Sequence, residues 1–128
     1  LGDPGVSILE PFVGTGTFIT RLLQLGLIPP EQLEYKYLNE IFGNEIVLLS
    51  YYIASINIEA VYHEVRKEQG FSDEYTEFPG LALTDTFQIY ESDGKIEGLG
   101  DLQANIERVQ RQKDANIIPI HVRIHGFK

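Results

Sequence analysis

The residues best placed to do chemistry form a glycine turn near the start of the chain. Residues 8–19 read ILEPFVGTGTFI, in which an apolar strand leads through Glu10 and Pro11 to glycines at positions 14 and 16 and then to a helix. Glycine permits a positive φ and lets a ligand approach main-chain N–H groups, because no Cβ stands in the way. The stretch is therefore a candidate cradle for a nucleotide-like cofactor, although a Gly-x-Gly turn alone is common.

Two carboxylates follow later strands, where they could bind such a cofactor. Glu45 is expected at the end of the second strand, where its two oxygens match the adjacent hydroxyls of a ribose. Asp85 is expected after the third strand, within reach of the amino edge of an adenine that Phe87 could flank. Each carboxylate could instead cap the following helix or loop. Glu40 competes with Glu45 if the second strand ends earlier.

A parallel sheet would bring these residues together. The pattern of the chain predicts strands near residues 7–9, 38–44, 81–84 and 117–124, with helices near 17–25, 46–68 and 101–113 and a helical turn at 31–37. This alternation favours an α/β fold with a parallel sheet of about four strands and flanking helices. In such a sheet the ligand lies beyond the carboxyl ends of the strands. The glycine turn, the pair Asn44 and Glu45, and Asp85 then converge at that end.

The composition fits one small domain over residues 1–128, with 43% hydrophobic and 23% charged residues. The chain has no cysteine, and the histidines at positions 63, 121 and 125 lack metal-ligand spacing, so we expect no metal site. The longest apolar stretch, residues 46–58, is interrupted by polar side chains. We therefore expect no membrane partner and a cytoplasmic location.

The charge argues against strong DNA binding by this chain alone. With 19 acidic and 10 basic residues the net charge is −9, which repels a phosphate backbone. Arg108, Arg111 and Lys113 form a small basic cluster, which we interpret as a solvated helix face. The chain has no methionine and reaches its first apolar run within a few residues, so we interpret it as a piece of a longer protein.

Three segments together resemble a known family. EPFVGTGTFITRLL, GNEIVLLSYYIASINIE and LTDTFQ are similar, in order and spacing, to the first three cofactor motifs of amino-methylating DNA methyltransferases. The likeness is to the large methylases of restriction–modification systems, including those fused to a helicase, and it covers nearly the whole chain. It implies a truncated, Rossmann-like methyltransferase fold, S-adenosylmethionine as the cofactor, and DNA as a partner of the intact parent through methylation of adenine N6.

The resemblance implies roles for residues of the glycine turn. Glu10 would orient the methionine end of the cofactor, and Phe18 would pack beneath it. The backbone of Gly14, Thr15 and Gly16 would lie against the cofactor. The remaining motif residues of this turn are Pro11 and Phe12.

The second and third segments would bind the nucleoside. By the same resemblance, Glu45 would hold the ribose hydroxyls and Ile46 would contact the face of the adenine. Asp85 and Phe87 would address the adenine amino group and its ring.

The chain departs from the family after the fourth predicted strand. The family requires a Pro-Pro-aromatic motif there, after Asp or Asn, which holds the flipped adenine. The corresponding residues 117–128 read IIPIHVRIHGFK. We therefore assign no catalytic residue and expect the fragment itself to be inactive. An apolar edge strand at residues 117–124 would have unpaired backbone groups, so we expect self-association through it.

Two other hypotheses remain open. The chain could be a non-catalytic Rossmann-like remnant or interaction domain that binds no cofactor. It could also belong to a methyltransferase that acts on a small molecule or a protein. Affinity for S-adenosylmethionine distinguishes a DNA methyltransferase fragment from a non-catalytic remnant. The residues after the fourth strand distinguish it from a methyltransferase that acts on a small molecule or a protein.

Overall fold

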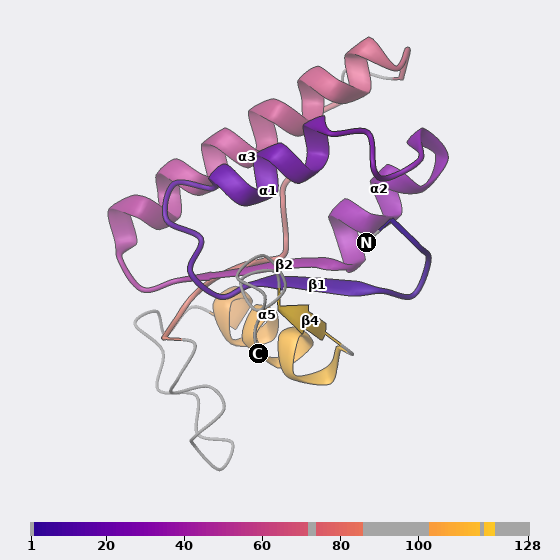
Figure 1. Cartoon of the computed structure of the whole chain (residues 1–128). Helices are drawn as coiled ribbons and strands as arrows, with labels where there is room; N and C mark the ends of the chain where they lie inside the picture. Colours follow the sequence, from indigo (N-terminus) through magenta and orange to yellow (C-terminus); the bar gives the residue numbers. More distant parts are fainter. Residues whose placement is uncertain (1, 72–73, 86–102, 116, 120–128) are drawn as a thin grey trace, which may run out of the picture.

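The fold is a parallel sheet with helices on both of its faces (Figure 1). The computed structural model describes residues 2–71, 74–85, 103–115 and 117–119. In chain order the elements are β1 (Ser7–Glu10), α1 (Thr17–Gln24), α2 (Pro30–Asn39), β2 (Ile41–Glu45), α3 (Leu48–Glu68), β3 (Leu81–Leu83), α5 (Gln103–Asp114) and β4 (Ile117–Pro119).

The sheet has the strand order β3-β2-β1-β4, and every neighbouring pair is parallel. Ile8 of β1 pairs with Ile41 of β2, and Gly43 of β2 pairs with Leu81 of β3. The chain passes from β1 to β2 on one side of β1 and returns to β4 on the other. The predicted α/β class with a four-stranded parallel sheet is confirmed, and the carboxyl ends of the strands lie together.

The main core lies between the sheet and the helices α1 and α3 (Figure 1). Ile8 and Ile41 of the sheet and Ile19 and Ile58 of these helices are all fully or almost fully buried. Burying side chains of this size removes apolar surface from water, which is the main favourable term in folding. Successive residues of β1, β2 and β3 are buried, so both faces of the sheet are covered, as is typical of a parallel sheet.

Several element bounds differ from the prediction. The second strand begins at Ile41, not at residue 38, because α2 continues to Asn39. Leu33, Lys36 and Tyr37 of α2 are buried at helical spacing, so the end of this segment is held by packing in a helix. The predicted strand 117–124 is present over Ile117–Pro119, and residues 120–124 lie outside the described part of the chain.

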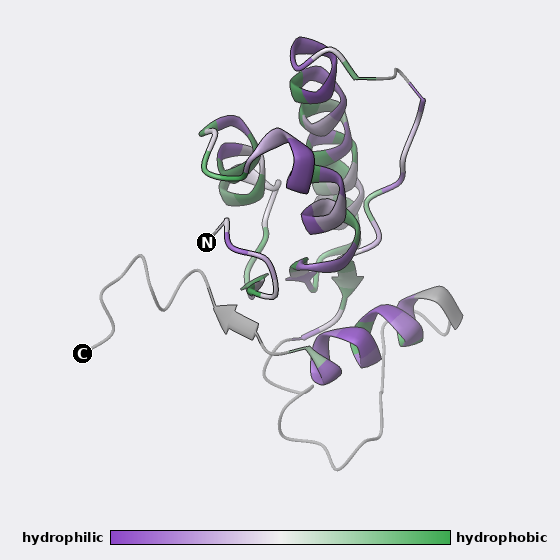
Figure 2. Cartoon of the chain, turned by 90° about the vertical axis from the view of Figure 1, so that its right-hand side faces the viewer, coloured by the Kyte–Doolittle hydropathy of each residue, from purple (hydrophilic) through white to green (hydrophobic). Residues whose placement is uncertain are grey.

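Helix α5 covers the opposite face of the sheet and is largely hydrophilic (Figure 2). The interpretation of a solvated face is wrong for Arg108, whose side chain is largely buried, whereas Arg111 is exposed. Arg108 donates hydrogen bonds to the carbonyl oxygen of Leu81 and to the hydroxyl of Tyr51, and Arg111 donates one to the carbonyl oxygen of Leu38. Backbone carbonyls at the start of β3 and near the end of α2 accept these bonds and hold α5 against the fold.

No helix in the described part of the chain combines the length and the apolar content that a bilayer span requires.

Candidate functional site

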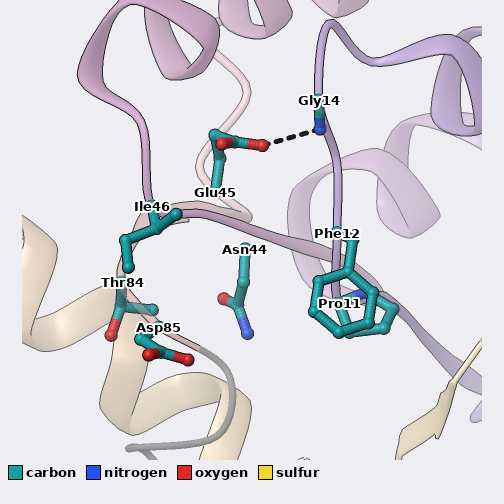
Figure 3. A pocket seen from close by; sticks show the side chains of 8 residues that line it. All are labelled: Pro11, Phe12, Gly14, Asn44, Glu45, Ile46, Thr84 and Asp85. Carbon is teal, nitrogen blue, oxygen red and sulfur yellow. Dashed lines mark hydrogen bonds between the residues drawn. The ribbon is translucent and has the colours of Figure 1, made fainter.

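A cavity of about 420 Å³ lies at the carboxyl ends of β1, β2 and β3. Three segments that are distant in sequence form its walls: the turn after β1, the end of β2 with the residue beyond it, and the two residues after β3. The lining residues are Pro11, Phe12, Gly14, Asn44, Glu45, Ile46, Thr84 and Asp85 (Figure 3). Six of these residues belong to the predicted cofactor-binding set, and the cavity lies where a doubly wound sheet binds its ligands.

The two glycines of the turn have different surroundings. Gly14 has a φ of 58° and Gly16 a φ of 92°, in a region that side chains with a Cβ rarely adopt. A Cβ on Gly14 would meet nothing within 4 Å, whereas a Cβ on Gly16 would lie 3.2 Å from Cγ1 of Ile58. Gly14 therefore lines the cavity, and Gly16 allows α1 to begin close against α3.

Glu45 joins the turn to the start of α3. Its Oε2 accepts a hydrogen bond of 2.7 Å from the N–H of Gly14 (Figure 3). Its Oε1 accepts one of 3.0 Å from the N–H of Val47. Val47 is the residue before α3, which has no side-chain cap, so this bond fixes the connection from β2 to α3 without capping the helix. A carboxylate has about four acceptor positions, so these two bonds are compatible with further hydrogen bonds to a ligand.

The polar side chains of Asn44 and Asp85 reach into the same space (Figure 3). The carbonyl oxygen of Asn44 accepts a hydrogen bond of 3.0 Å from Val13, which ties the turn to the end of β2. The N–H of Thr84 donates a bond of 2.9 Å to the carbonyl oxygen of Glu45 and extends the pairing of β2 and β3 by one residue. Asp85 follows directly, so the strand pairing sets where its carboxylate enters the cavity.

Four predicted residues do not line the cavity. Glu10 is fully buried, and its Oε1 accepts a hydrogen bond of 2.9 Å from the N–H of Phe12. The carbonyl oxygen of Thr15 accepts a bond from the side chain of Asn57 in α3. The other two are Gly16 and Phe18. Glu10 ends β1, Thr15 and Gly16 belong to the turn, and Phe18 lies in α1. Phe87 lies outside the described residues.

Glu40 is not a competitor for the cavity. It directly precedes β2, so it lies at the amino end of the strand, whereas Glu45 lies at the carboxyl end. Its Oε1 forms an ion pair of 3.3 Å with Nζ of Lys36, and both side chains are almost completely buried. Lys36 also donates to the carbonyl oxygens of Asp3 and Val6.

Two lining residues had not been assigned a role from the sequence. The sequence gives no role to Thr84, and it predicts Asn44 at the site only as the neighbour of Glu45. Each directly precedes a predicted carboxylate at the end of a strand, which was the available signal. Over the part of the chain that the structure describes, no group of three metal-ligating side chains occurs.

Comparison with known proteins gives matches among solved structures. No protein-family model and no curated protein matches the chain. A nuclease-deletion mutant of the Type ISP restriction–modification enzyme LlaGI, solved with a DNA substrate mimic, is 41% identical with a TM-score of 0.78. The DrdV–DNA complex is 40% identical with a TM-score of 0.75, and the ATP-dependent Type ISP restriction–modification enzyme LlaBIII bound to DNA is 38% identical with a TM-score of 0.73.

Each match covers 93% of this chain but only 11% of DrdV, 10% of LlaGI and 8% of LlaBIII. The chain therefore spans about a tenth of the length of these neighbours. It is similar in fold and in sequence to a segment of Type ISP restriction–modification enzymes.

Proposed function

We propose that this chain is the S-adenosylmethionine-binding part of a DNA adenine-N6 methyltransferase from a restriction–modification enzyme. One observation carries the proposal. Acidic side chains at the ends of two neighbouring strands, Glu45 and Asp85, share one cavity with the main chain of a glycine turn at Gly14. This combination supplies carboxylate acceptors for a nucleoside and an exposed backbone for the rest of the cofactor.

The chemistry of the lining supports a nucleoside ligand. Phe12 and Ile46 are 51% and 49% exposed at the cavity, so their apolar surfaces are available to pack against a ring. Glu45 would accept from the ribose hydroxyls, and Asp85 would accept from the adenine amino group. A cavity of about 420 Å³ is also within the size range of small-molecule sites, roughly 300–1,000 Å³.

The bound cofactor would supply an activated methyl group, and the residues of this chain would hold and orient it. Phe12 and Ile46 would exclude water from the adenine ring, while Glu45 would fix the ribose. Positioning of this kind matters because transfer to a base nitrogen depends on close alignment of the reacting groups. The chain has no Pro-Pro-aromatic motif in residues 117–128, so we propose that it binds cofactor without transferring the methyl group.

The DNA partner is proposed for the longer protein. LlaGI and LlaBIII are restriction–modification enzymes seen with DNA or a DNA mimic, and DrdV is seen with DNA. The net charge of −9 makes this chain alone a poor DNA ligand, so the parent enzyme would supply the DNA contacts from other segments. β4, one of the two outer strands in the order β3-β2-β1-β4, offers an edge for pairing with a second copy or with the rest of the longer protein.

Calorimetric titration with S-adenosylmethionine and S-adenosylhomocysteine tests the cofactor site. We expect binding by the wild-type chain, weakened by about 1–3 kcal/mol in each of Glu45→Ala and Asp85→Ala, because a polar ligand group loses its partner. Glu64→Ala, at an exposed position of α3, is the matched control and should bind like wild type. A folded wild-type chain that binds neither ligand would exclude the proposal.

A second candidate function is a non-catalytic interaction domain without a cofactor. The hydrogen bonds of Glu45 to Gly14 and Val47 favour it, because they give this carboxylate a structural role that needs no ligand. Under this hypothesis Glu45→Ala lowers stability while both cofactor titrations remain flat.

A further inference from the structure

The outer strand β3 is paired along its free edge by a side chain of α5. The N–H of Leu83 donates a hydrogen bond of 2.8 Å to Oδ1 of Asn105, and Nδ2 of Asn105 donates one of 3.0 Å to the carbonyl oxygen of Leu83. Asn105 is only 6% exposed. Its amide therefore occupies the place that the backbone of another strand would take beside β3.

Asn105 pairs backbone groups of Leu83 that an edge strand would otherwise leave without partners. Successive residues of a strand direct their backbone groups to alternate sides, and Thr84 bonds to Glu45 of β2 on the inner side. The N–H and C=O of Leu83 point outward and would be buried without partners if Asn105 were apolar. An asparagine amide presents one donor and one acceptor at the spacing of a peptide group, so it satisfies both.

The position of this pair along β3 connects it to the cavity. Leu83 is the last residue of β3, and Thr84 and Asp85, which line the cavity, follow it directly. The end of β3 is thus held from both sides: β2 binds Thr84 on one side and Asn105 binds Leu83 on the other. Freedom to rotate about the backbone at Leu83 would move the carboxylate of Asp85 away from its place in the cavity.

We propose that Asn105 is a positioning residue of the cofactor site, which fixes the end of β3 and thereby the place of Asp85. The inference rests on the proposed function, because it assigns to Asp85 a contact with the cofactor. Asn105 does not line the cavity, so it acts only through the backbone of Leu83 and the residues that follow.

Arg108 of the same helix provides a matched control. It donates to the carbonyl oxygen of Leu81, the first residue of β3, and to Glu77 and Tyr51. It therefore anchors α5 to the opposite end of the same strand. Loss of Arg108 weakens the packing of α5 on β3 without releasing the end that leads to Asp85.

A double-mutant cycle in cofactor binding tests the proposal. We expect Asn105→Ala to weaken binding of S-adenosylhomocysteine by roughly three- to tenfold, the equivalent of one net hydrogen bond. In the Asp85→Ala background the same change should have little further effect, because two residues that act through one contact are not additive. Arg108→Ala should leave the affinity of the folded chain unchanged.

Asn105→Asp gives a second test that does not depend on a cavity at position 105. Above the carboxyl pKa the new side chain can accept from the N–H of Leu83 but cannot donate to its carbonyl oxygen. Burial at this position raises the pKa of the new carboxyl above its usual value of about 3.9, and the protonated group can do both. The affinity relative to wild type should therefore recover progressively as the pH falls from 8 towards 5. This recovery also keeps the proposal testable if Asn105→Ala does not fold.

The outcomes separate this inference from the proposed function. Equal losses of affinity from Asn105→Ala in the wild-type and Asp85→Ala backgrounds, with no recovery of Asn105→Asp at low pH, would overturn the positioning role and leave the cofactor site intact. Absence of binding by the wild-type chain would overturn both. Amide hydrogen exchange supplies a readout without ligand: Asn105→Ala should accelerate exchange at Leu83 and Thr84 but not at Gly43, and a change at Leu83 alone would also contradict the proposal.

Discussion

Glu40 directly precedes the strand β2 and Glu45 is its last residue, and the two carboxylates have different partners and burial. Glu40, at the amino end, is buried and forms an ion pair with Lys36. Glu45, at the carboxyl end, is partly exposed, accepts hydrogen bonds from two backbone N–H groups and lines the cavity. The same side chain on one strand is thus a buried structural group at one end and a candidate ligand at the other.

This difference follows from what each end of a parallel strand meets. The amino end of β2 follows directly from α2, whose Lys36 supplies an opposite charge beside Glu40. A buried charge is tolerated only when it is paired and hydrogen-bonded. At the carboxyl end, Glu45 meets turns instead of a helix side chain. The backbone N–H groups of Gly14 and Val47 donate to it, and its carboxylate can still accept from a ligand in the cavity. Charge and burial therefore distinguish two glutamates that sequence patterns treat as equivalent.

The largest effect that would separate the two ends comes from Lys36. We expect Lys36→Met to lower the free energy of unfolding by about 3–5 kcal/mol, because the buried carboxylate of Glu40 loses its partner. Urea denaturation measures the change. The double variant Lys36→Met with Glu40→Leu should recover part of the loss, since it removes both charges but still leaves the carbonyl oxygens of Asp3 and Val6 without the Lys36 donor. A loss below about 1 kcal/mol in the single variant would mean that Glu40 is hydrated like a surface group.

The two ends of β2 also show which features of the fold and the site could be predicted from the sequence. Apolar runs and glycine positions predicted the order of strands, and their carboxyl ends brought Glu45 and Asp85 to one cavity as expected. The start of β2 was misplaced because residues 38 and 39 extend α2, whose buried face is set by tertiary packing. The partners of a polar residue depend on contacts across the fold, so neither the burial of Glu40 nor the anchoring role of Arg108 could be predicted locally.

A smaller effect is expected in the turn that faces Glu45. Gly16→Ala should lower the free energy of unfolding by roughly 2 kcal/mol, from a left-handed backbone position that disfavours a Cβ and from the 3.2 Å approach to Ile58. Gly14→Ala is the matched control, with a positive φ but open space around the Cβ, and should lose about 1 kcal/mol. Thermal unfolding of both variants compares them. Equal losses would show that contact with α3 contributes nothing.

The smallest effect concerns how the free energy of unfolding depends on pH through Tyr37 of α2. Tyr37, next to Lys36 in α2, is buried, stacks on Tyr62 with ring centroids 3.6 Å apart, and donates a hydrogen bond of 2.9 Å to the carbonyl oxygen of Thr76. Burial, together with the Glu59 carboxylate nearby, raises the pKa of the Tyr37 hydroxyl far above its usual value of 10.

The folded state therefore keeps this phenol neutral at pH values where the unfolded chain ionises it. Its contribution to stability is fully present below pH 10 and is lost progressively as the pH rises above 10, which amounts to roughly 1 kcal/mol at pH 10.5. Urea denaturation at pH 8 and pH 10.5 should show a steeper loss for wild type than for Tyr37→Phe, which has no hydroxyl to ionise. Because Tyr51 and Tyr62 also have raised pKa values, the variant should retain part of the pH dependence. Parallel losses in the two proteins would show that Tyr37 ionises with equal ease in the folded and unfolded states, and the alkaline sensitivity would then belong to the other tyrosines.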